Sequence, residues 1–133
     1  MNKLLLLALI VMLSGCISSG NSIVNANIPI ERGNYYYFEI TTPKQANIHG
    51  NFSVLSDSTN EDGKDIIVSI IGENSYEDWK NGFNVTEFYN SGQVNNGVID
   101  ANVPKGDYYV IYSNRYTTFY NKIVKTNVSI VGD

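Results

Sequence analysis

Apolar and polar side chains alternate along most of the chain beyond residue 33, and this period of two is typical of β-strands. In residues 34–42, for example, Tyr36, Phe38 and Ile40 fall on one face of the predicted strand. Residues 97–103 alternate in the same way. The segments with a strand pattern are 34–42, 46–55, 65–71, 86–89, 97–103, 108–113 and 121–131.

Turn residues separate these segments, and almost no helix interrupts them. Ser91-Gly92 and Pro104–Asp107 both have the composition of turns. Residues 73–82 depart from the strand period. Ser75 stands at a helix N-cap position with Asp78 three residues later, so we expect one short helical turn covering an end of the fold. About eight short strands with so little helix predict an all-β chain, a single antiparallel β-sandwich that is jelly-roll-like.

The first 15 residues have the layout of a secretory signal peptide. Lys3 precedes an apolar run over residues 4–13, and small residues follow the run. As a signal helix this run is too short to cross a bilayer permanently, because a span takes about 20 apolar residues.

The sequence Leu-Ser-Gly-Cys at residues 13–16 resembles the lipobox of prokaryotic lipoproteins. The resemblance implies cleavage before Cys16 and attachment of lipid to that cysteine. The protein would then be held by the lipid bilayer, on the extracytoplasmic face of the cell membrane. An ordinary signal peptide is the alternative. Residues 16–27 are mostly small or polar, so we expect a flexible tether there and the sandwich over residues 28–133.

The net charge limits the classes of molecule that this protein can bind, and the cysteine content limits the covalent cross-links in its fold. The chain has a formal net charge of -4, which becomes -5 once the leader and its single charged residue, Lys3, are removed. This excess of negative charge disfavours nucleic acid and an anionic lipid surface as partners. Cys16 is the only cysteine, so the fold has no disulfide and depends on packing alone.

Residues 103–114, Val-Pro-Lys-Gly-Asp-Tyr-Tyr-Val-Ile-Tyr-Ser-Asn, resemble a late strand of the GOLD-type domains of emp24-like cargo proteins. They are also similar to pre-peptidase C-terminal domains, the sandwiches appended to secreted hydrolases, and residues 48–54 fit the same layout. Such domains are binding or accessory modules. The resemblance therefore implies a β-sandwich without catalytic residues of its own.

Groups suited to catalysis are few. His49, the only histidine, falls on the polar face of its predicted strand, and the chain has no nucleophile-elbow motif. Lipidation would consume the only thiol, and the thirteen acidic residues form no recognisable constellation. We therefore expect no enzymatic activity and no cofactor.

Residues 57–63 gather oxygen ligands, among them Asp57, Asn60 and Asp62, in front of a glycine. Aligned on that glycine, the segment lacks the acid that a calcium loop needs at its first position and the glutamate at its last. We expect a solvated hairpin loop here, with a calcium site as the alternative.

Aromatic residues are numerous, with ten Tyr, five Phe and one Trp. Many fall on predicted core faces, but Tyr35, Tyr37 and Tyr109 face outward. Residues 115–120, Arg-Tyr-Thr-Thr-Phe-Tyr, hold too many rings for a merely solvated loop. Exposed rings stack on sugars and favour protein interfaces. The candidate ligand contacts are therefore Arg115, Tyr116, Phe119, Tyr120 and Tyr109. The alternative is a loop folded down over the end of the core.

Three Asn-x-Ser/Thr sequons begin at Asn51, Asn84 and Asn127. Asn51 and Asn127 fall on predicted polar faces, so glycosylation is expected at these sequons only where the host has that machinery.

Taken together, these features predict a membrane-anchored extracytoplasmic lipoprotein. Its sandwich would act as a non-catalytic binding module for a glycan or a protein partner at the cell surface. The alternative is a structural or accessory subunit of an envelope complex that has no soluble ligand.

Overall fold

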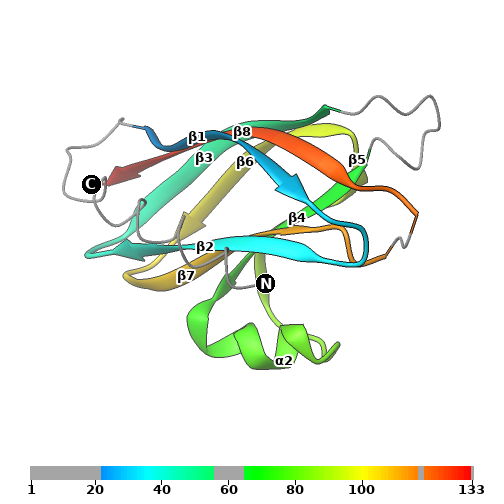
Figure 1. Ribbon diagram of the computed structural model, residues 1–133. Coiled ribbons are helices and arrows are strands. Elements are labelled where there is room, and N and C mark those ends of the chain that lie inside the picture. Colours follow the sequence, from blue (N-terminus) through cyan, green and yellow to red (C-terminus); the bar gives the residue numbers. More distant parts are fainter. Residues whose placement is uncertain (1–21, 56–64, 117–118, 133) are drawn as a thin grey trace.

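The computed structural model describes residues 22–55, 65–116 and 119–132, and over these ranges the chain folds into two stacked antiparallel sheets (Figure 1). The strands are β1 (Ser22–Ile30), β2 (Tyr35–Thr42), β3 (Ala46–Leu55), β4 (Ile66–Gly72), β5 (Glu87–Val94), β6 (Asn96–Val103), β7 (Gly106–Ser113) and β8 (Lys122–Gly132). A 3₁₀ turn (Glu73–Ser75) runs directly into the helix α2 (Tyr76–Lys80).

The strand order defines a jelly roll. One sheet has the order β1-β8-β3-β6 and the other β2-β7-β4-β5, and every neighbouring pair is antiparallel. Each sheet thus alternates strands from the two halves of the chain, the arrangement that two nested Greek keys produce. The predicted all-β, jelly-roll-like sandwich is confirmed.

The core lies between the two sheets and follows the period of two. In β2, Tyr36, Phe38 and Ile40 are all buried, as predicted from the alternation. In β6, Ile99 is fully buried whereas its neighbour Val98 is 71% exposed. Alternate residues of a strand point to opposite faces, so the sequence pattern was sufficient to identify the inner face.

β1 begins earlier than the sequence predicted. Residues 22–27, expected to belong to the tether, pair with β8, and the sandwich therefore begins at Ser22 rather than at residue 28. Ile23 and Val24 are each only 8% exposed. Residues 16–27 as a whole are mostly small or polar, so the apolar pair Ile23-Val24 was not recognised as part of a strand, although both side chains are buried.

The helical segment is also placed differently from expectation. It covers the outer face of the β2-β7-β4-β5 sheet and not an end of the sandwich (Figure 1). The reason is an apolar patch on that face, where Ile71, Tyr109 and Ile111 are buried beneath Tyr76 and Trp79. Ser75 does occupy the N-cap position of α2, but its side chain makes no capping hydrogen bond.

β5 is longer than predicted because Ser91-Gly92 does not end it. The pairing of β5 with β4 shifts register twice, and Gly92 adopts a φ of 68° within the strand. Such an irregularity is a β-bulge, which uses the same residue types as a turn. The sequence therefore predicted a turn at Ser91-Gly92 where the structure has a bulge within β5.

Gly50 in β3 is required by a close approach to β8. A Cβ added at this position would overlap the carbonyl oxygen of Asn127. The backbones of β3 and β8 can therefore approach each other here only because residue 50 has no side chain.

The sandwich has two distinct ends. The near end is the one at which β1 begins, and it also carries the β2–β3 turn (residues 43–45) and the β6–β7 turn (residues 104–105). The far end carries the β1–β2 turn (residues 31–34), the β5–β6 turn at Asn95 and the loop that follows β7. In Figure 1 the near end lies at the left and the far end at the right.

Candidate functional site

Four of the predicted ligand contacts lie in the far-end loop between β7 and β8. Arg115 and Tyr120 are half-buried, whereas Tyr116 is 37% exposed and Phe119 is 77% exposed. The ring centroids of Phe119 and Tyr120 are 6.4 Å apart. The loop therefore presents at least one large apolar ring to solvent, as the recognition hypothesis requires.

Asn114 fixes the base of this loop. It is fully buried, and its side-chain amide donates to the carbonyl oxygens of Tyr120 at 2.8 Å and Glu31 at 3.2 Å. Its Oδ1 accepts a hydrogen bond from the Lys122 ammonium at 2.8 Å. One side chain thus holds both ends of the loop and the β1–β2 turn together.

Lys122 and Asp65 form a second anchor beneath Tyr116. The Lys122 Nζ lies 3.4 Å from Asp65 Oδ1, and the Tyr116 hydroxyl donates to the same oxygen at 2.6 Å. Partial burial by itself raises the pKa of Asp65, but hydrogen bonds from Tyr116 and Gln93 and the charge of Lys122 outweigh burial and hold the pKa below its ordinary value. Tyr116 is therefore positioned by an ionised carboxylate.

Arg115 joins the loop to α2. Its guanidinium lies 4.1 Å from the centre of the Trp79 ring and 5.3 Å from that of Tyr35. It also donates hydrogen bonds to the carbonyl oxygens of Lys80 at 2.9 Å and Trp79 at 3.2 Å. These are carbonyls at the C-terminal end of α2, which a helix cannot satisfy internally.

Tyr109 is on the outward face of β7, as predicted, but α2 covers it. Its side chain is only 9% exposed, with ring centroids 4.8 Å from Tyr37 and 5.0 Å from Tyr76. The Tyr35 and Tyr76 hydroxyls share a hydrogen bond of 2.5 Å in the same cluster. Burial raises the pKa of both Tyr76 and Tyr109 above the ordinary value. Tyr109 is therefore a packing residue in this structure, separate from the far-end loop.

A groove of about 370 Å³ lies on the outer face of the β2-β7-β4-β5 sheet, beside α2. We call it the β4 groove, and its lining residues are Ile67, Ser69, Trp79, Glu87, Asn90, Ser113, Arg115 and Tyr116. Arg115 and Tyr116 come from the predicted loop. Glu87 accepts two hydrogen bonds from the Asn90 amide, at 3.0 and 2.9 Å. The groove thus combines aromatic rings with a guanidinium, a carboxylate, an amide, two serine hydroxyls and the Tyr116 hydroxyl.

Sequence reasoning missed Trp79, Glu87 and Asn90 as parts of this site. Trp79 falls within residues 73–82, the segment predicted to form a helical turn, and its approach to Arg115 depends on where α2 packs. Glu87 and Asn90 lie on an edge strand whose extent was underestimated. The alternation of residues along β5 is the sequence feature that points to Glu87 and Asn90. The bulge at Gly92 interrupts this alternation, so the strand was predicted too short.

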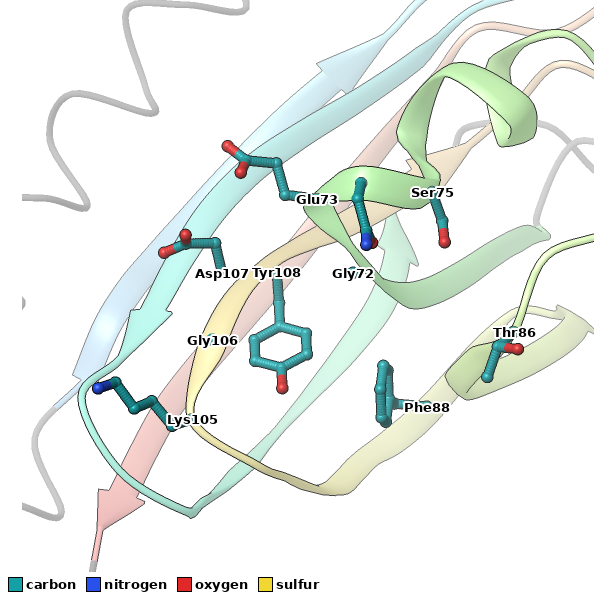
Figure 2. Close-up of a pocket in the computed structure, with 10 residues that line it drawn as sticks. Gly72, Glu73, Ser75, Thr86, Phe88, Lys105, Gly106, Asp107 and Tyr108 are labelled. Atoms are coloured by element: carbon teal, nitrogen blue, oxygen red, sulfur yellow. The ribbon is translucent and has the colours of Figure 1, made fainter.

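A second cavity, of about 430 Å³, opens at the near end (Figure 2). The rings of Phe88 and Tyr108 meet edge to face in it, with centroids 5.2 Å apart. Tyr108 is held by a 2.6 Å hydrogen bond from its hydroxyl to the carbonyl oxygen of Pro104. Figure 2 shows that the carboxylates of Glu73 and Asp107 point away from these rings. The pattern of rings and turns in the sequence did not predict this cavity.

The remaining sequence candidates are dispersed. Asp57, Asn60 and Asp62, the calcium candidates, lie outside the described residues. Among the residues that are described, no three His, Cys, Asp or Glu side chains come together as a metal site. His49 lies on the outer face of β3, as predicted, with its Nδ1 3.0 Å from the Asn47 side-chain oxygen.

The sequon asparagines differ in accessibility. Asn51 and Asn84 are exposed, whereas Asn127 is half-buried and its side-chain oxygen accepts a hydrogen bond from Ser22 at 2.5 Å. Cys16 and the leader lie outside the described ranges. Within those ranges, no helix is long and apolar enough to cross a membrane.

No known family and no curated protein matches the sequence. Solved structures with a similar arrangement include the pre-peptidase C-terminal domain of a collagenase from Bacillus anthracis, at 14% identity and a TM-score of 0.49, covering 80% of this chain and 89% of that one. Another is PliG of Salmonella Typhimurium, a periplasmic inhibitor of g-type lysozyme, at 17% identity and a TM-score of 0.49, covering 86% and 92%. PliG of Aeromonas hydrophila has 11% identity and a TM-score of 0.49, covering 80% and 84%. These likenesses concern architecture and assign no activity to this chain.

Proposed function

We propose that this protein is a lipid-anchored extracytoplasmic lipoprotein whose sandwich binds a partner in the β4 groove. The observation that carries the proposal is the meeting of Arg115 and Tyr116 with Trp79 in one groove. Cys16, as the lipidated residue, would hold the module at the cell membrane. Tyr109 is not part of the proposed site, because α2 covers it.

The chemistry of the groove favours a glycan as the ligand. Aromatic faces pack against the apolar faces of sugar rings, while polar groups hydrogen-bond the hydroxyls that orient them. Trp79 and Tyr116 supply rings, and Glu87 and Asn90 supply an acceptor and a donor. About 370 Å³ is near the lower limit for small-ligand sites, so the groove suits a short stretch of saccharide.

The proposed activity is binding without catalysis. Among the described residues that line the groove, Glu87 is the one carboxylate. Hydrolysis of a glycosidic bond generally uses a pair of carboxyl groups flanking the bond. The described lining of the groove therefore supplies groups that hold a saccharide, and this supports a binding role.

A specific observation also favours the second candidate, an accessory subunit of an envelope complex. Phe119 at the far end is 77% exposed, and Phe83 beyond α2 is 66% exposed. Large exposed rings of this kind are typical of protein interfaces. In this case the partner would be a protein that covers the far-end loop.

Trp79 provides the test, because it is the only tryptophan in the chain and it lines the groove. The full-length protein in detergent is titrated with a panel of envelope glycans while the Trp79 emission is recorded. We expect saturable binding that Tyr116→Ser weakens at least about tenfold, the loss expected for one well-packed aromatic contact. Phe83→Ser, which removes an exposed ring outside the groove, is the matched control.

Thermal unfolding of each variant separates recognition from packing. If Tyr116→Ser or Phe119→Ser unfolds the protein, the loop is part of the core cover and the recognition hypothesis is wrong. If the folded Tyr116→Ser variant binds glycans as wild type does, the groove is not the site. Recovery of one envelope protein by full-length protein, lost in Phe119→Ser, would support the accessory-subunit candidate instead.

A further inference from the structure

The start of β1 limits how far the sandwich can stand from a lipidated Cys16. Only residues 17–21 separate Cys16 from Ser22, so six Cα steps span at most about 20 Å. Ser22 is fixed in the sheet, since it pairs with Ser129 and its hydroxyl donates to Asn127. The 12-residue tether expected from the sequence would have allowed about twice that reach.

The near end presents two adjoining turns with the same composition. Pro43-Lys44 follows β2, and Pro104-Lys105 precedes β7. Thr42 ties the turns together, because its hydroxyl donates to the Pro104 carbonyl at 3.0 Å and accepts from the Gly106 amide at 3.1 Å. Both lysines are exposed.

Lysine ammonium groups suit the phosphates of lipid headgroups, which attract basic side chains close to the bilayer surface. Two carboxylates also belong to this region, since Asp107 and Glu73 line the near-end cavity. One carboxylate oxygen of Asp107 already accepts a hydrogen bond, from the Thr41 hydroxyl at 2.8 Å. The two lysines stand on the turn tips, whereas Glu73 belongs to the segment that leads into α2.

The flank covered by α2 is unsuited to an anionic bilayer. Glu77, Asp78 and Glu87 lie on or beside it, against two basic residues: Arg115, which is stacked on Trp79, and Lys80, which is paired with Glu77 at 3.4 Å. A net negative flank is repelled by anionic headgroups. This opposes an orientation in which the sandwich lies on the β4 groove.

We infer that the sandwich stands on the membrane by its near end, with lipid headgroups facing Lys44 and Lys105 and with the β4 groove and Phe119 displayed outward. The inference rests on the proposed anchoring through Cys16. The far end is then about 25 Å higher than the near end, the length of an eight-residue strand such as β6. The near-end cavity of Figure 2 faces the bilayer, so the outward-facing site for a large partner is the groove.

The test measures the height of single sites above a membrane. Gln45→Cys, Asn102→Cys and Asn95→Cys variants of the lipidated full-length protein keep both lysines, and all three positions are exposed. Each variant is labelled with an environment-sensitive fluorophore and reconstituted into phosphatidylethanolamine/phosphatidylglycerol vesicles; the lipidated sulfur of Cys16 does not react with the label. Because the near-end and far-end sites differ in height by about 25 Å, we expect headgroup nitroxides to quench the labels at positions 45 and 102 at least about twofold more than the label at position 95.

A control insertion tests the role of the short tether. Twelve Gly/Ser residues inserted between Gly20 and Asn21 should bring the quenching at the three sites together, because the sandwich is then free to tumble. Equal quenching at the three sites without the insertion, or stronger quenching at position 95, would overturn the inferred orientation. Failure of the unlabelled protein to float with vesicles, with a mass lacking lipid, would overturn the anchoring itself.

Discussion

Lys122 shows how a charged residue can belong to the interior of this fold. The residue is 1% exposed, yet its ammonium has oxygen partners on Asp65 and Asn114, at 2.7 Å to the Asp65 carbonyl and 2.8 Å to Asn114 Oδ1. A buried charge is tolerated only when such partners replace water. The resulting network connects β8, the start of β4 and the far-end loop, so the position of Tyr116 depends on it.

At the residue scale, Asp65→Asn should destabilise the protein by about 3 kcal/mol at pH 7, because Lys122 loses the negative charge that compensates it. The pKa of Asp65 is lower in the folded state than its ordinary value, so its contribution is fully present above about pH 4 and is lost as the pH falls through the folded pKa. Urea unfolding from pH 7 to pH 2 checks this, with a stability difference between wild type and variant that shrinks only below about pH 4.

Asp100→Asn is the control for net charge, since Asp100 is exposed on the outer face of β6. A stability difference for Asp65→Asn that stayed constant down to pH 2 would show that the carboxylate charge does not stabilise the fold.

At the scale of elements, α2 acts as a small third layer. Rings that the sequence placed outward on β2, Tyr35 and Tyr37, do face away from the sandwich core, but they meet Tyr76 and Trp79 of α2. Arg115 then stacks on Trp79 and satisfies the last carbonyls of the helix. A five-residue helix is too short to be stable alone, so its position is set by this aromatic contact.

The prediction at the scale of elements concerns the first half of β1. A chain beginning at Ile28 loses the buried side chains of Ile23 and Val24 and part of the pairing with β8. It should be about 3–6 kcal/mol less stable than a chain beginning at Ser22, since burial of each of the two side chains contributes about 1.5–3 kcal/mol. Urea unfolding of the two chains, both without Cys16, measures the difference. Identical midpoints would show that residues 22–27 act as a tether after all.

At the scale of the whole molecule, the two ends of the sandwich have separate tasks in the proposed arrangement. The near end receives the chain from the anchor, and the far end carries the loop and one margin of the groove. The strands between them are antiparallel throughout and have a shared core, so they form a rigid spacer. Changes at one end are therefore expected to leave the other intact.

Cys16→Ser tests this separation. The intact mass of the variant should lack the attached lipid, while its free energy of unfolding stays within about 0.5 kcal/mol of a wild-type sandwich, because residue 16 precedes β1. Ser18→Ala, in the same segment, should keep the mass of the lipid. A lipid-sized mass increment on Cys16→Ser would contradict lipidation at that cysteine.

The sequence alone determined which face of most strands is buried, because side chains alternate between the two faces of a sheet. Tyr36, Phe38 and Ile40 were correctly assigned to one buried face on this basis. It also marked the far-end loop as unusually rich in rings. These are local properties, readable from the spacing of residues along a strand.

Only the tertiary structure decided which distant residues meet. The β4 groove takes Trp79 from α2, Glu87 from β5 and Arg115 from the far-end loop, and no local pattern relates these positions. Likewise, the sequence predicted a tether over residues 22–27, whereas in the structure this segment pairs with β8. The pairing satisfies its backbone hydrogen bonds, and Ile23 and Val24 are buried in the core. Local patterning sets what each segment can bury, but the packing of segments against one another sets which surfaces remain open to bind a partner.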